Sequence, residues 1–599
     1  MAWYDEAVFY HIYPLGLTGA PKQNDYGEPV HRLNTLLPWV DHIKEIGGSA
    51  LYIGPLFESV GHGYETTDYK KLDSRLGTNE DLTAFVAYCH EQGIKVIFDG
   101  VFNHTGRDFF AFKDIQANRE NSQYKDWYCN VNFWGNNEYN DGFSYDNWGG
   151  YNLLVKLNQK NPAVVDYICD VIRFWVSEFD VDGIRLDAAD VLDFDFMKAL
   201  RRTANEVKPD FWLMGEVIHG DYSRWVNGET LHSVTNYTLH KALYSGHNDH
   251  NYFEIAHTVR RLQNMGTLKL YNFVDNHDVE RIYTKLTNKA HFAPVHVLLY
   301  TLPGVPSIYY GSEFGIEGRK EYGSDDSLRP ALNIEDYKDS VKTNPCTALI
   351  AALGKVRQAV PALSYGRYDE LMLTNRQFAY ARDLDGTRVI VSVNNDDAPA
   401  GMHLAAGNCT AYIGALSGEK VSVQDGHINI TQPANSGEIW VPEGTDLDVK
   451  PVKVVTKTES EAKTNTEDKA ASETATDAKG NKGAEPKIES KESKDIVTAT
   501  ESADAKKNTT NTEKNISAAN EVKDSAKDAS AQAAADTPVD PETITVDWSK
   551  SPESMTVPEL QAAILAKLAG NGPVDAQMKK TVTDNIWHDS LVNWLKSFR

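Results

Sequence analysis

Residues 183–187 read GIRLD, and this stretch decides the fold. It is a short run with β-branched and apolar residues, it follows a long helical pattern, and it ends in an acid, as parallel strands do when a polar site lies at their carboxyl ends. The same rhythm of a short β-type run and a longer helical pattern repeats over residues 1 to about 330 and is typical of βα units. Eight such runs occur: Val8–Tyr13, Ala50–Ile53, Lys95–Asp99, Gly183–Asp187, Phe211–Gly215, Ser233–Tyr237, Lys269–Val274 and Val305–Tyr310.

Eight parallel strands with intervening helices predict a closed (β/α)8 barrel of the TIM type, in the α/β class. We assign residues 1–104 and 156–365 to this barrel. Residues 105–155 are rich in Asn, Gly, Tyr and Trp and are too long for a plain βα loop, so they predict a small inserted domain after the third strand. Residues 366–447 alternate apolar and polar positions in short runs, which predicts an antiparallel β-sandwich.

The remaining C-terminal sequence changes character twice. Residues 448–547 consist mainly of charged, small and polar residues with almost nothing to bury, which predicts a disordered linker. Residues 548–599 predict a small helical module, because TVPE at 556–559 is a capping-box pattern and Gly570 is a suitable helix stop. A second helix from about Val574 would carry an amphipathic face, which either packs on its neighbour or binds a protein or glucan partner.

The overall charge limits the partners of the chain. The net charge of -25, without a sustained cluster of Lys and Arg, argues against nucleic acid and anionic membranes and favours a neutral polymer. The five cysteines are widely spaced and form no CxxC pair, and the N-terminus is acidic without a long apolar run. We therefore expect a cytoplasmic protein, or a secreted or cell-surface one if a signal peptide was removed from this sequence.

Acidic residues stand at four predicted strand ends, where barrel enzymes place their active sites. The four ends read DGVFNH (99–104), GIRLD (183–187), GEV (215–217) and FVDNHD (273–278). A lone Asp at a strand end is usually a helix cap or a loop anchor, but four such ends together favour a catalytic site. Asp187, Glu216 and Asp278 are thereby predicted to converge on one rim.

These carboxylates suit the cleavage of a glycosidic bond with retention. That reaction needs one ionised carboxylate that attacks the anomeric carbon and one protonated carboxyl that protonates the leaving oxygen, about 5–5.5 Å apart. Arg185, two residues before Asp187, is expected to keep it ionised, while neighbouring carboxylates raise the pKa of Glu216. Asp278 is expected to bind sugar hydroxyls and to favour the positive charge of the transition state.

The four blocks resemble the ordered signature of the α-amylase family, glycoside hydrolase family 13. Further matching blocks are HGYETTDY (62–69), LVKLN (154–158) and GVPSIYYG (304–311). The resemblance covers roughly the first 440 residues and implies a catalytic barrel, the family's inserted domain B and its sandwich domain C. It does not cover the C-terminal tail.

The resemblance also implies roles for single residues. Asp187 would be the nucleophile, Glu216 the acid/base and Asp278 the transition-state stabiliser. The residues implied around the sugar of the cleaved unit are Tyr64, which stacks on the ring, with Asp99, His104, Arg185 and His277, and those implied at the next sugar are Asp325 and Arg329. No cofactor is required for this chemistry.

Calcium is possible at one position. Asn103 matches an asparagine that binds a structural calcium ion in many relatives, with further oxygen ligands from domain B. The sequence does not identify those further ligands by motif, and an Asn at a strand end is otherwise a turn former.

Two blocks depart from the common α-amylase pattern. Many α-amylases follow the nucleophile with Ala-Ala-Lys-His, whereas residues 188–191 read AADV here, so the specificity on the leaving-group side is open. The blocks KLN (156–158) and GEVIH (215–219) are similar to the neopullulanase and cyclomaltodextrinase branch, which accepts short or cyclic α-glucans and sometimes transfers glycosyl units.

The leading hypothesis is therefore a retaining endo-hydrolase of α-1,4-glucosidic bonds in starch, glycogen or maltodextrins, acting by double displacement. The alternative is a cyclomaltodextrinase, a neopullulanase or a 4-α-glucanotransferase. A third hypothesis, from another class, is a catalytically silent subunit that binds a glucan or a partner, as some proteins of this fold do. The presence of all three carboxylates argues against it.

Overall fold

The computed structural model describes residues 2–266, 268–321, 324–449, 451, 546, 550–552, 555–569, 582 and 595. The chain divides into two compact units, Met1–Val497 and Thr498–Arg599. The predicted linker, residues 448–547, lies almost wholly outside the described residues.

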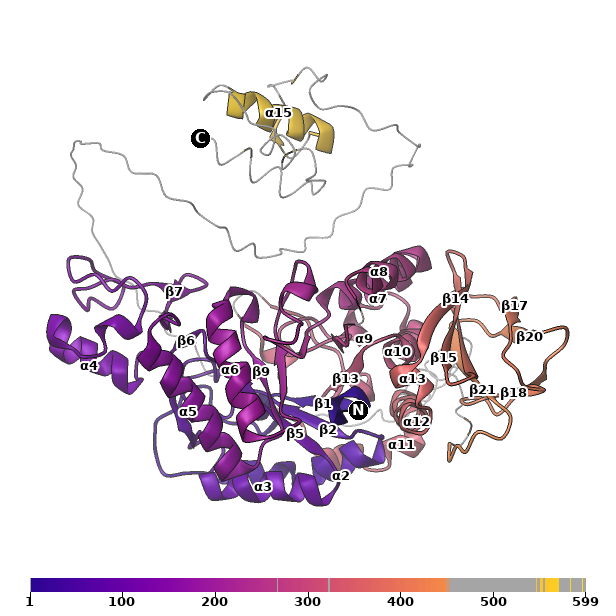
Figure 1. Ribbon diagram of the computed structural model, residues 1–599, viewed down its shortest axis with the longest axis horizontal. Coiled ribbons are helices and arrows are strands. Elements are labelled where there is room, and N and C mark those ends of the chain that lie inside the picture. The colour runs from indigo at the N-terminus through magenta and orange to yellow at the C-terminus, as the bar shows by residue number, and fades with distance from the viewer. Residues whose placement is uncertain are drawn as a thin grey trace, which may run out of the picture. The chain divides into compact units, whose positions relative to one another are not determined.

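The first unit is built on an eight-stranded parallel sheet (Figure 1). Its strands are β1 (Phe9–Ile12), β2 (Ala50–Ile53), β5 (Lys95–Gly100), β9 (Gly183–Leu186), β10 (Trp212–Gly215), β11 (Ser233–Val234), β12 (Tyr271–Asn272) and β13 (Val305–Tyr309). They run in the order β11-β10-β9-β5-β2-β1-β13-β12, and a parallel bridge between Thr235 and Tyr271 joins the two outer strands. The sheet is therefore a closed barrel, and each of the eight predicted runs contributes one strand.

Helices surround this barrel and cover its outer face (Figure 1). The helices of the first unit are α1 (Pro14–Leu17), α2 (Leu37–Glu45), α3 (Asn79–Glu91), α4 (Phe110–Asn118), α5 (Pro162–Phe179), α6 (Phe194–Val207), α7 (Tyr237–Asn248), α8 (Tyr252–Asn264), α9 (Ile282–Lys285), α10 (Phe292–Thr301), α11 (Ser340–Thr343), α12 (Pro345–Ala359) and α13 (Ala362–Tyr365). Local signals set the ends of α5: Asn161 Oδ1 accepts a hydrogen bond from Ala163 N at 2.9 Å, and Asp180 is left-handed, with φ 53°. The chain then enters β9, the strand that ends at Asp187.

The alternation of side chains along the strands decides which of them reach the inside of the barrel. On β5, Phe98 packs among the surrounding helices, whereas Ile97 belongs to the interior cluster. Because successive side chains point to opposite faces of a strand, Asp99 shares the inner side with Ile97. On β9, Leu186 faces the helices and Arg185 points inward by the same rule.

A smaller antiparallel sheet interrupts the barrel after β5. It contains β6 (His104–Thr105), β7 (Asn147–Trp148) and β8 (Tyr151–Lys156) in the order β6-β8-β7. Figure 1 shows β6, β7 and α4 at the end of the unit that lies opposite the C-terminal sheets. The fold therefore includes the predicted insertion, while the boundaries 105 and 155 stay a prediction.

Two antiparallel sheets follow the barrel and form the predicted sandwich. Their strands are β14 (Arg367–Leu373), β15 (Gln377–Leu384), β16 (Thr387–Asn394), β17 (Ala400–Ala405), β18 (Ala411–Gly414), β19 (Lys420–Ser422), β20 (His427–Gln432) and β21 (Ser436–Pro442). The larger sheet has the order β14-β15-β16-β21-β18-β19, and β17 pairs with β20. Ile390 and Trp440 of the first sheet pack against Met402 and Ile428 of the second, so one apolar core joins the two layers.

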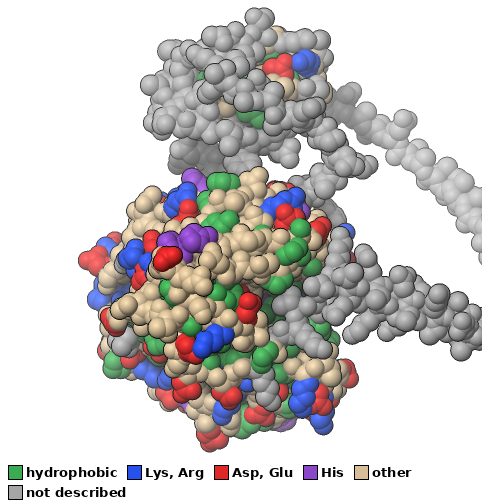
Figure 2. Space-filling view, turned by 90° about the vertical axis from the view of Figure 1, so that its right-hand side faces the viewer, with side chains coloured by type: hydrophobic (Ala, Val, Ile, Leu, Met, Phe, Trp, Pro, Cys, Tyr) green, Lys and Arg blue, Asp and Glu red, His purple; other side chains and the backbone are tan. Residues whose placement is uncertain are grey.

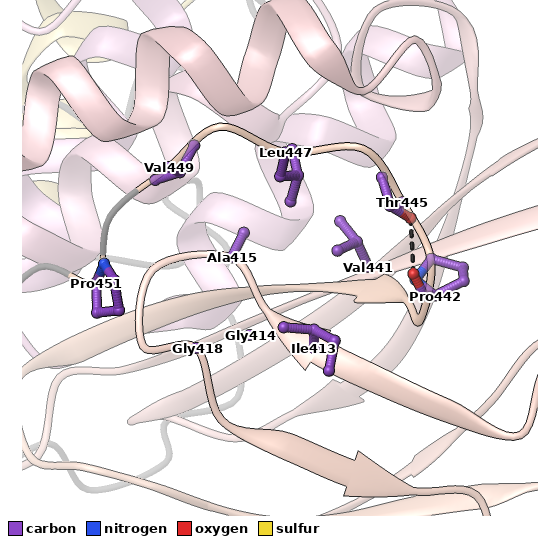
Figure 3. A pocket seen from close by; sticks show the side chains of 10 residues that line it. All are labelled: Ile413, Gly414, Ala415, Gly418, Val441, Pro442, Thr445, Leu447, Val449 and Pro451. Carbon is purple, nitrogen blue, oxygen red and sulfur yellow. Dashed lines mark hydrogen bonds between the residues drawn. The ribbon is translucent and has the colours of Figure 1, made fainter.

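The surface of this end of the unit is mixed in charge. Figure 2 shows acidic and basic side chains scattered among uncharged ones, with hydrophobic side chains between them. The chain that follows β21 passes back over the sheet, where Leu447 and Val449 face Ala415 and Val441 across a small cavity (Figure 3). This segment therefore covers apolar side chains at the edge of the larger sheet.

The second unit contains the helix α15 (Val557–Ala569). Thr556 N donates to Glu559 Oε2 at 2.7 Å, which is the glutamate half of the predicted capping box, and Thr556 Oγ1 donates to the same oxygen at 3.0 Å. The predicted helix stop, Gly570, and the second helix from Val574 lie outside the described residues, apart from the buried Val582 and Leu595. No helix in the described part of the chain has both the length and the apolarity needed to cross a bilayer.

Several strands are shorter than their sequence runs. The clearest cases are β12, which spans only Tyr271–Asn272 of the predicted Lys269–Val274, and β11. Ser233–Tyr237 reads as a strand, but β11 ends at Val234 and Tyr237 begins α7. The reason is local: Asn236 Oδ1 accepts a hydrogen bond from Leu239 N at 3.1 Å and caps the helix. Tyr237 thereby stands at a helix start beside the barrel rim, which bears on the site.

Candidate active site

Arg185 is the centre of a buried cluster of charged side chains at the carboxyl ends of the barrel strands. Its Nη1 donates to Asp99 Oδ1 at 2.8 Å and to Asp187 Oδ1 at 2.9 Å, and its Nη2 lies 3.0 Å from Glu216 Oε2. The arginine is 3% exposed. One guanidinium therefore holds carboxylates from three neighbouring strand ends, a geometry that its planar set of donors allows.

The barrel register creates this arrangement. Asp99 on β5 pairs directly with Arg185 on β9. The ladder continues past the strand ends, because Asp187 N donates to Gly100 O at 3.1 Å and Glu216 N donates to Leu186 O at 2.9 Å. These backbone hydrogen bonds thus fix the positions of Asp187 and Glu216 independently of their side-chain contacts.

Asp99 is held from its other side by two tyrosines. Its Oδ2 accepts hydrogen bonds from Tyr52 OH at 2.8 Å and from Tyr64 OH at 3.1 Å. Tyr64 OH is also hydrogen-bonded to His277 Nε2 at 2.5 Å. Tyr64 and His277 therefore join the cluster, as the sequence predicts, and Tyr52 completes the coordination of Asp99.

Glu216 receives two further hydrogen bonds, both from groups next to the cluster. Its Oε2 accepts from Ala188 N at 3.0 Å, and its Oε1 accepts from Tyr237 OH at 3.4 Å. Ala188 has a left-handed backbone, with φ 47°, which turns its N–H toward Glu216. The residue after Asp187 thereby positions the second carboxyl group.

Asp278 forms a second cluster beside the first. Its Oδ2 lies 3.0 Å from His277 Nε2, and its Oδ1 accepts from Arg329 Nη2 at 2.9 Å. Arg329 Nη2 also donates to Asp325 Oδ2 at 2.9 Å, and Arg329 Nε donates to His277 O at 3.0 Å. The pair Asp325 and Arg329 therefore reaches the predicted site and is linked to it through Asp278.

The two clusters shift the pKa values of Asp187 and Asp278 in opposite directions. Burial raises the pKa of Asp187 well above its ordinary value, and Glu216, Asp99 and Asp278 add to this rise, whereas Arg185 opposes it. Burial also acts to raise the pKa of Asp278, but His277 and Arg329 outweigh it and hold this pKa well below the ordinary value. Arg185 alone therefore does not keep the pKa of Asp187 low, contrary to the expectation from sequence. The cluster around Arg185 places three carboxylates around one cation, and repulsion from Glu216 and Asp99 adds to the raised pKa of Asp187.

His104 and Asn103 are linked to the backbone of Tyr64 by hydrogen bonds. His104 Nε2 is hydrogen-bonded to Tyr64 O at 3.1 Å, and its Nδ1 lies 3.2 Å from Asn103 Nδ2. Burial lowers the pKa of His104 to about 3, so the ring is neutral. His104 Nε2 thus supports the loop that carries Tyr64, while Nδ1 bonds the neighbouring Asn103 amide. Neither nitrogen contacts a carboxylate of the two clusters.

Asn103 is a partial match to a calcium ligand. Its buried Oδ1 has no hydrogen-bond partner among the described residues, as a metal ligand would. However, the described residues contain no group of three or more His, Cys, Asp or Glu side chains that could hold a metal ion. Calcium at Asn103 therefore stays a prediction, and no step of the chemistry is assigned to a metal.

Several residues of the site were missed by the motif analysis. These residues are Tyr13, Tyr52, Asn276 and Tyr237. The Arg329 guanidinium lies 4.8 Å from the Tyr13 ring, and Asn276 Nδ2 donates to Tyr237 OH at 3.2 Å. Tyr13 and Tyr237 are the last residues of predicted runs, so the rule that strand ends face the site would have identified them.

Two apolar side chains are exposed directly after the catalytic candidates. Val191 and Ile218 are each 39% exposed. Val191 belongs to the short helical turn Ala189–Val191 that follows Asp187, and Ile218 lies two residues after Glu216. Val191 stands where many α-amylases carry the histidine of the Ala-Ala-Lys-His run.

A closed (β/α)8 barrel with two carboxyl groups on one guanidinium at its carboxyl rim has the organisation of a glycoside hydrolase. Residues 32–355 match the family model described as "Alpha amylase, catalytic domain". The chain belongs to the α-amylase family, and it is a glycoside hydrolase.

Several proteins that are similar to this chain are named cyclomaltodextrinase. A cyclomaltodextrinase from Bacillus sp is 31% identical over 422 residues, which cover 66% of this chain and 74% of that protein. A cyclomaltodextrinase from Thermoanaerobacter pseudethanolicus is 32% identical over 419 residues, covering 66% and 71%. A solved structure named cyclomaltodextrinase matches with a TM-score of 0.65 at 26% identity, covering 73% of this chain and 78% of the other. Within the family, the chain is therefore similar to the cyclomaltodextrinase and neopullulanase branch, as residues 156–158 and 215–219 predict.

Proposed function

We propose that this enzyme hydrolyses α-1,4-glucosidic bonds of short and cyclic α-glucans with retention, as a cyclomaltodextrinase does. The single observation that supports this chemistry is the Arg185 guanidinium, which binds Asp187 through one terminal nitrogen and Glu216 through the other. The shared guanidinium brings the two carboxyl groups together at the barrel rim, which supports attack by one and proton donation by the other, as retaining enzymes require.

In the proposed reaction, the protonated carboxyl group of Glu216 donates its proton to the leaving glycosidic oxygen. Asp187 attacks the anomeric carbon in the same step, which gives a covalent glycosyl-enzyme and a free chain end. Glu216 then takes a proton from water, and the water oxygen displaces Asp187. Asp278, held by His277 and Arg329, stabilises the positive charge that develops on the sugar ring.

The proposed substrate differs from the starch preference that the sequence placed first. The relatives named cyclomaltodextrinase support short and cyclic α-glucans. Asp190 and Val191, which stand where many α-amylases carry Lys and His, support a different specificity on the leaving side. A reducing location such as the cytoplasm belongs to the same proposal and is supported by five cysteines that are all free thiols.

Product analysis tests the proposal. The enzyme is incubated with β-cyclodextrin, amylose and pullulan at equal mass concentration, and products are separated by chromatography while early product anomers are followed by proton NMR. We expect β-cyclodextrin to be opened faster than amylose is cut, with α-anomers formed first. Glu216→Gln serves as the control and should be inactive.

Other product patterns would indicate a different activity. Faster cleavage of amylose to mixed long fragments would restore the α-amylase hypothesis, and products longer than the substrate would indicate a glucanotransferase. Resistance of all three glucans, with activity only on an α-1,6 disaccharide, would contradict the proposal. Wild-type activity in Glu216→Gln would place the chemistry outside this cluster.

A further inference from the structure

Trp134 is the most exposed large hydrophobic side chain among the described residues, at 98%. It lies in the loop between β6 and β7, far from the carboxylates in sequence, and the reaction proposed above does not use it. A single exposed aromatic ring is common on protein surfaces, so the surroundings of Trp134 decide whether it is a candidate for binding.

Hydrogen bonds within the loop hold Trp134 in its exposed position. Asn132 Oδ1 accepts from Trp134 N at 3.0 Å, and Gly135 N donates to Asn132 O at 3.1 Å, which closes a tight turn. Asn132 and Ser144 exchange backbone hydrogen bonds of 2.8 and 3.0 Å, and a Cβ on Gly135 would overlap Ser144 Oγ. The backbone thereby fixes the direction in which the indole projects.

The neighbouring Phe133 shows the opposite orientation and anchors the turn. Its ring lies 5.7 Å from the buried Phe143 and 5.5 Å from the Arg119 guanidinium. Arg119 in turn donates to Asp141 O at 2.9 Å and to Gly142 O at 2.8 Å. One aromatic residue of the pair is thus used for packing, and the next one is left free for contact with a ligand.

A shallow, open hollow adjoins this turn. It is lined by Asn130, Val131, Asn132, Ser144, Tyr145 and Asp146. The lining offers amide, hydroxyl and carboxylate groups and contains no Lys or Arg, and Asn130 Nδ2 donates to Asp146 Oδ2 at 2.7 Å. Such groups match a ligand with many hydroxyls and no negative charge.

We propose that Trp134 and this hollow form an accessory α-glucan site, separate from the barrel rim. A pyranose ring has an apolar C–H face, which packs on an indole, and an edge of hydroxyls, which the Asn, Ser and Asp side chains can bind. The choice of an α-glucan rests on the proposed function, whereas the choice of a neutral saccharide rests on the side chains alone. The site would hold a long chain beside the enzyme without taking part in cleavage.

Affinity electrophoresis of the full chain in native gels that contain glycogen tests the site. The Asp187→Asn background prevents cleavage, and Trp134→Ala is compared in it with Phe253→Ala, which removes another exposed aromatic residue, 48% exposed, on α8. We expect Trp134→Ala to weaken glycogen retardation at least about tenfold and Phe253→Ala to leave it unchanged.

A second measurement separates this inference from the proposed function. In the active enzyme, Trp134→Ala should leave turnover of a small chromogenic maltoside unchanged and raise the KM for glycogen-derived chains. Equal retardation of the two variants, or no retardation of the parent, overturns the accessory site even if cyclodextrin is cleaved as proposed. Retardation that depends on Trp134 supports it even if cleavage fails. Light scattering that shows a loss of self-association in Trp134→Ala, with glycogen binding intact, would identify a subunit interface and overturn the site.

Discussion

The rim around Arg185 buries charged side chains, whereas the turn around Trp134 exposes an aromatic side chain to water. The rim buries the charges of Asp99, Arg185 and Asp187, whereas the turn leaves an indole 98% exposed. Both arrangements cost free energy in the isolated protein, since buried like charges repel each other and exposed apolar surface orders water. The chain thus departs twice from the rule that charges are exposed and apolar side chains are buried. The buried charges serve the proposed proton transfer, and the exposed indole serves the proposed glucan binding.

The largest expected effect comes from Asp187→Asn. Loss of the nucleophile should reduce turnover at least about 10³-fold, yet the melting temperature at pH 8 should rise by roughly 2 °C. The folded-state pKa of Asp187 is raised, so its ionisation favours the unfolded chain as the pH increases through that pKa. The stabilisation by Asn should therefore be present at pH 8 and disappear below about pH 4, the ordinary range of this group.

Asp278→Asn is the matched control for that measurement. Its carboxyl group has a lowered pKa, so it stabilises the fold above the ordinary carboxyl range, and this stability is lost as the pH falls through the folded-state pKa. We expect Asp278→Asn to lower the melting temperature at pH 8, opposite to Asp187→Asn. Equal shifts of the same sign in both variants would show that burial alone does not distinguish the two carboxyl groups.

The next effect concerns Arg185→Lys. A lysine keeps the positive charge but cannot bind Asp99, Asp187 and Glu216 at once, so kcat should fall about 10²-fold with a loss of about 1–3 kcal/mol in the free energy of unfolding. Arg357→Lys is the matched variant, because Arg357 is equally buried but donates only to the carbonyls of Tyr300 and Gly304. It should lose stability without losing kcat. A similar loss of kcat in both would mean that Arg185 acts through the fold.

A smaller effect is expected from Tyr237→Phe. Removal of one hydrogen bond to Glu216 should lower kcat about fivefold, which corresponds to about 1 kcal/mol. Tyr222→Phe provides the control, since the Tyr222 hydroxyl is bonded to Thr238 and not to a carboxylate of the rim. Steady-state rates on β-cyclodextrin check both variants, and an unchanged rate in Tyr237→Phe would exclude this tyrosine from positioning Glu216.

The smallest effect concerns the stability of Trp134→Ala. Because the indole is in water and Phe133 anchors the turn, the free energy of unfolding should change by no more than about 0.5 kcal/mol. Phe133→Ala should cost about 1–3 kcal/mol by comparison. Urea unfolding of the two variants measures the difference. Equal losses would show that Trp134 packs in solution and that the two regions do not differ in the way described.

Much of the barrel could be predicted because its signals are local. Each strand is a short run that a helix pattern follows, and the run at 183–187 alone joins a strand, an arginine and an acid. The length of β11 could not be predicted in this way, since the Asn236 cap competes with the strand for the same residues. The site was identified by the order of four strand ends, which share one rim in any closed parallel barrel.

Periodicity and motif order are properties of neighbouring residues, so they sufficed to predict the barrel, the insertion, the C-terminal sandwich and the convergence of Asp187, Glu216 and Asp278. Other features follow only from the folded chain: Arg185 binds three carboxylates, Tyr237 and Ala188 N hold Glu216, and Trp134 is exposed while Phe133 is packed. Burial and hydrogen bonding depend on residues that are distant in the chain and adjacent in space. They also set the opposite pKa shifts of Asp187 and Asp278, which two identical side chains acquire from different surroundings.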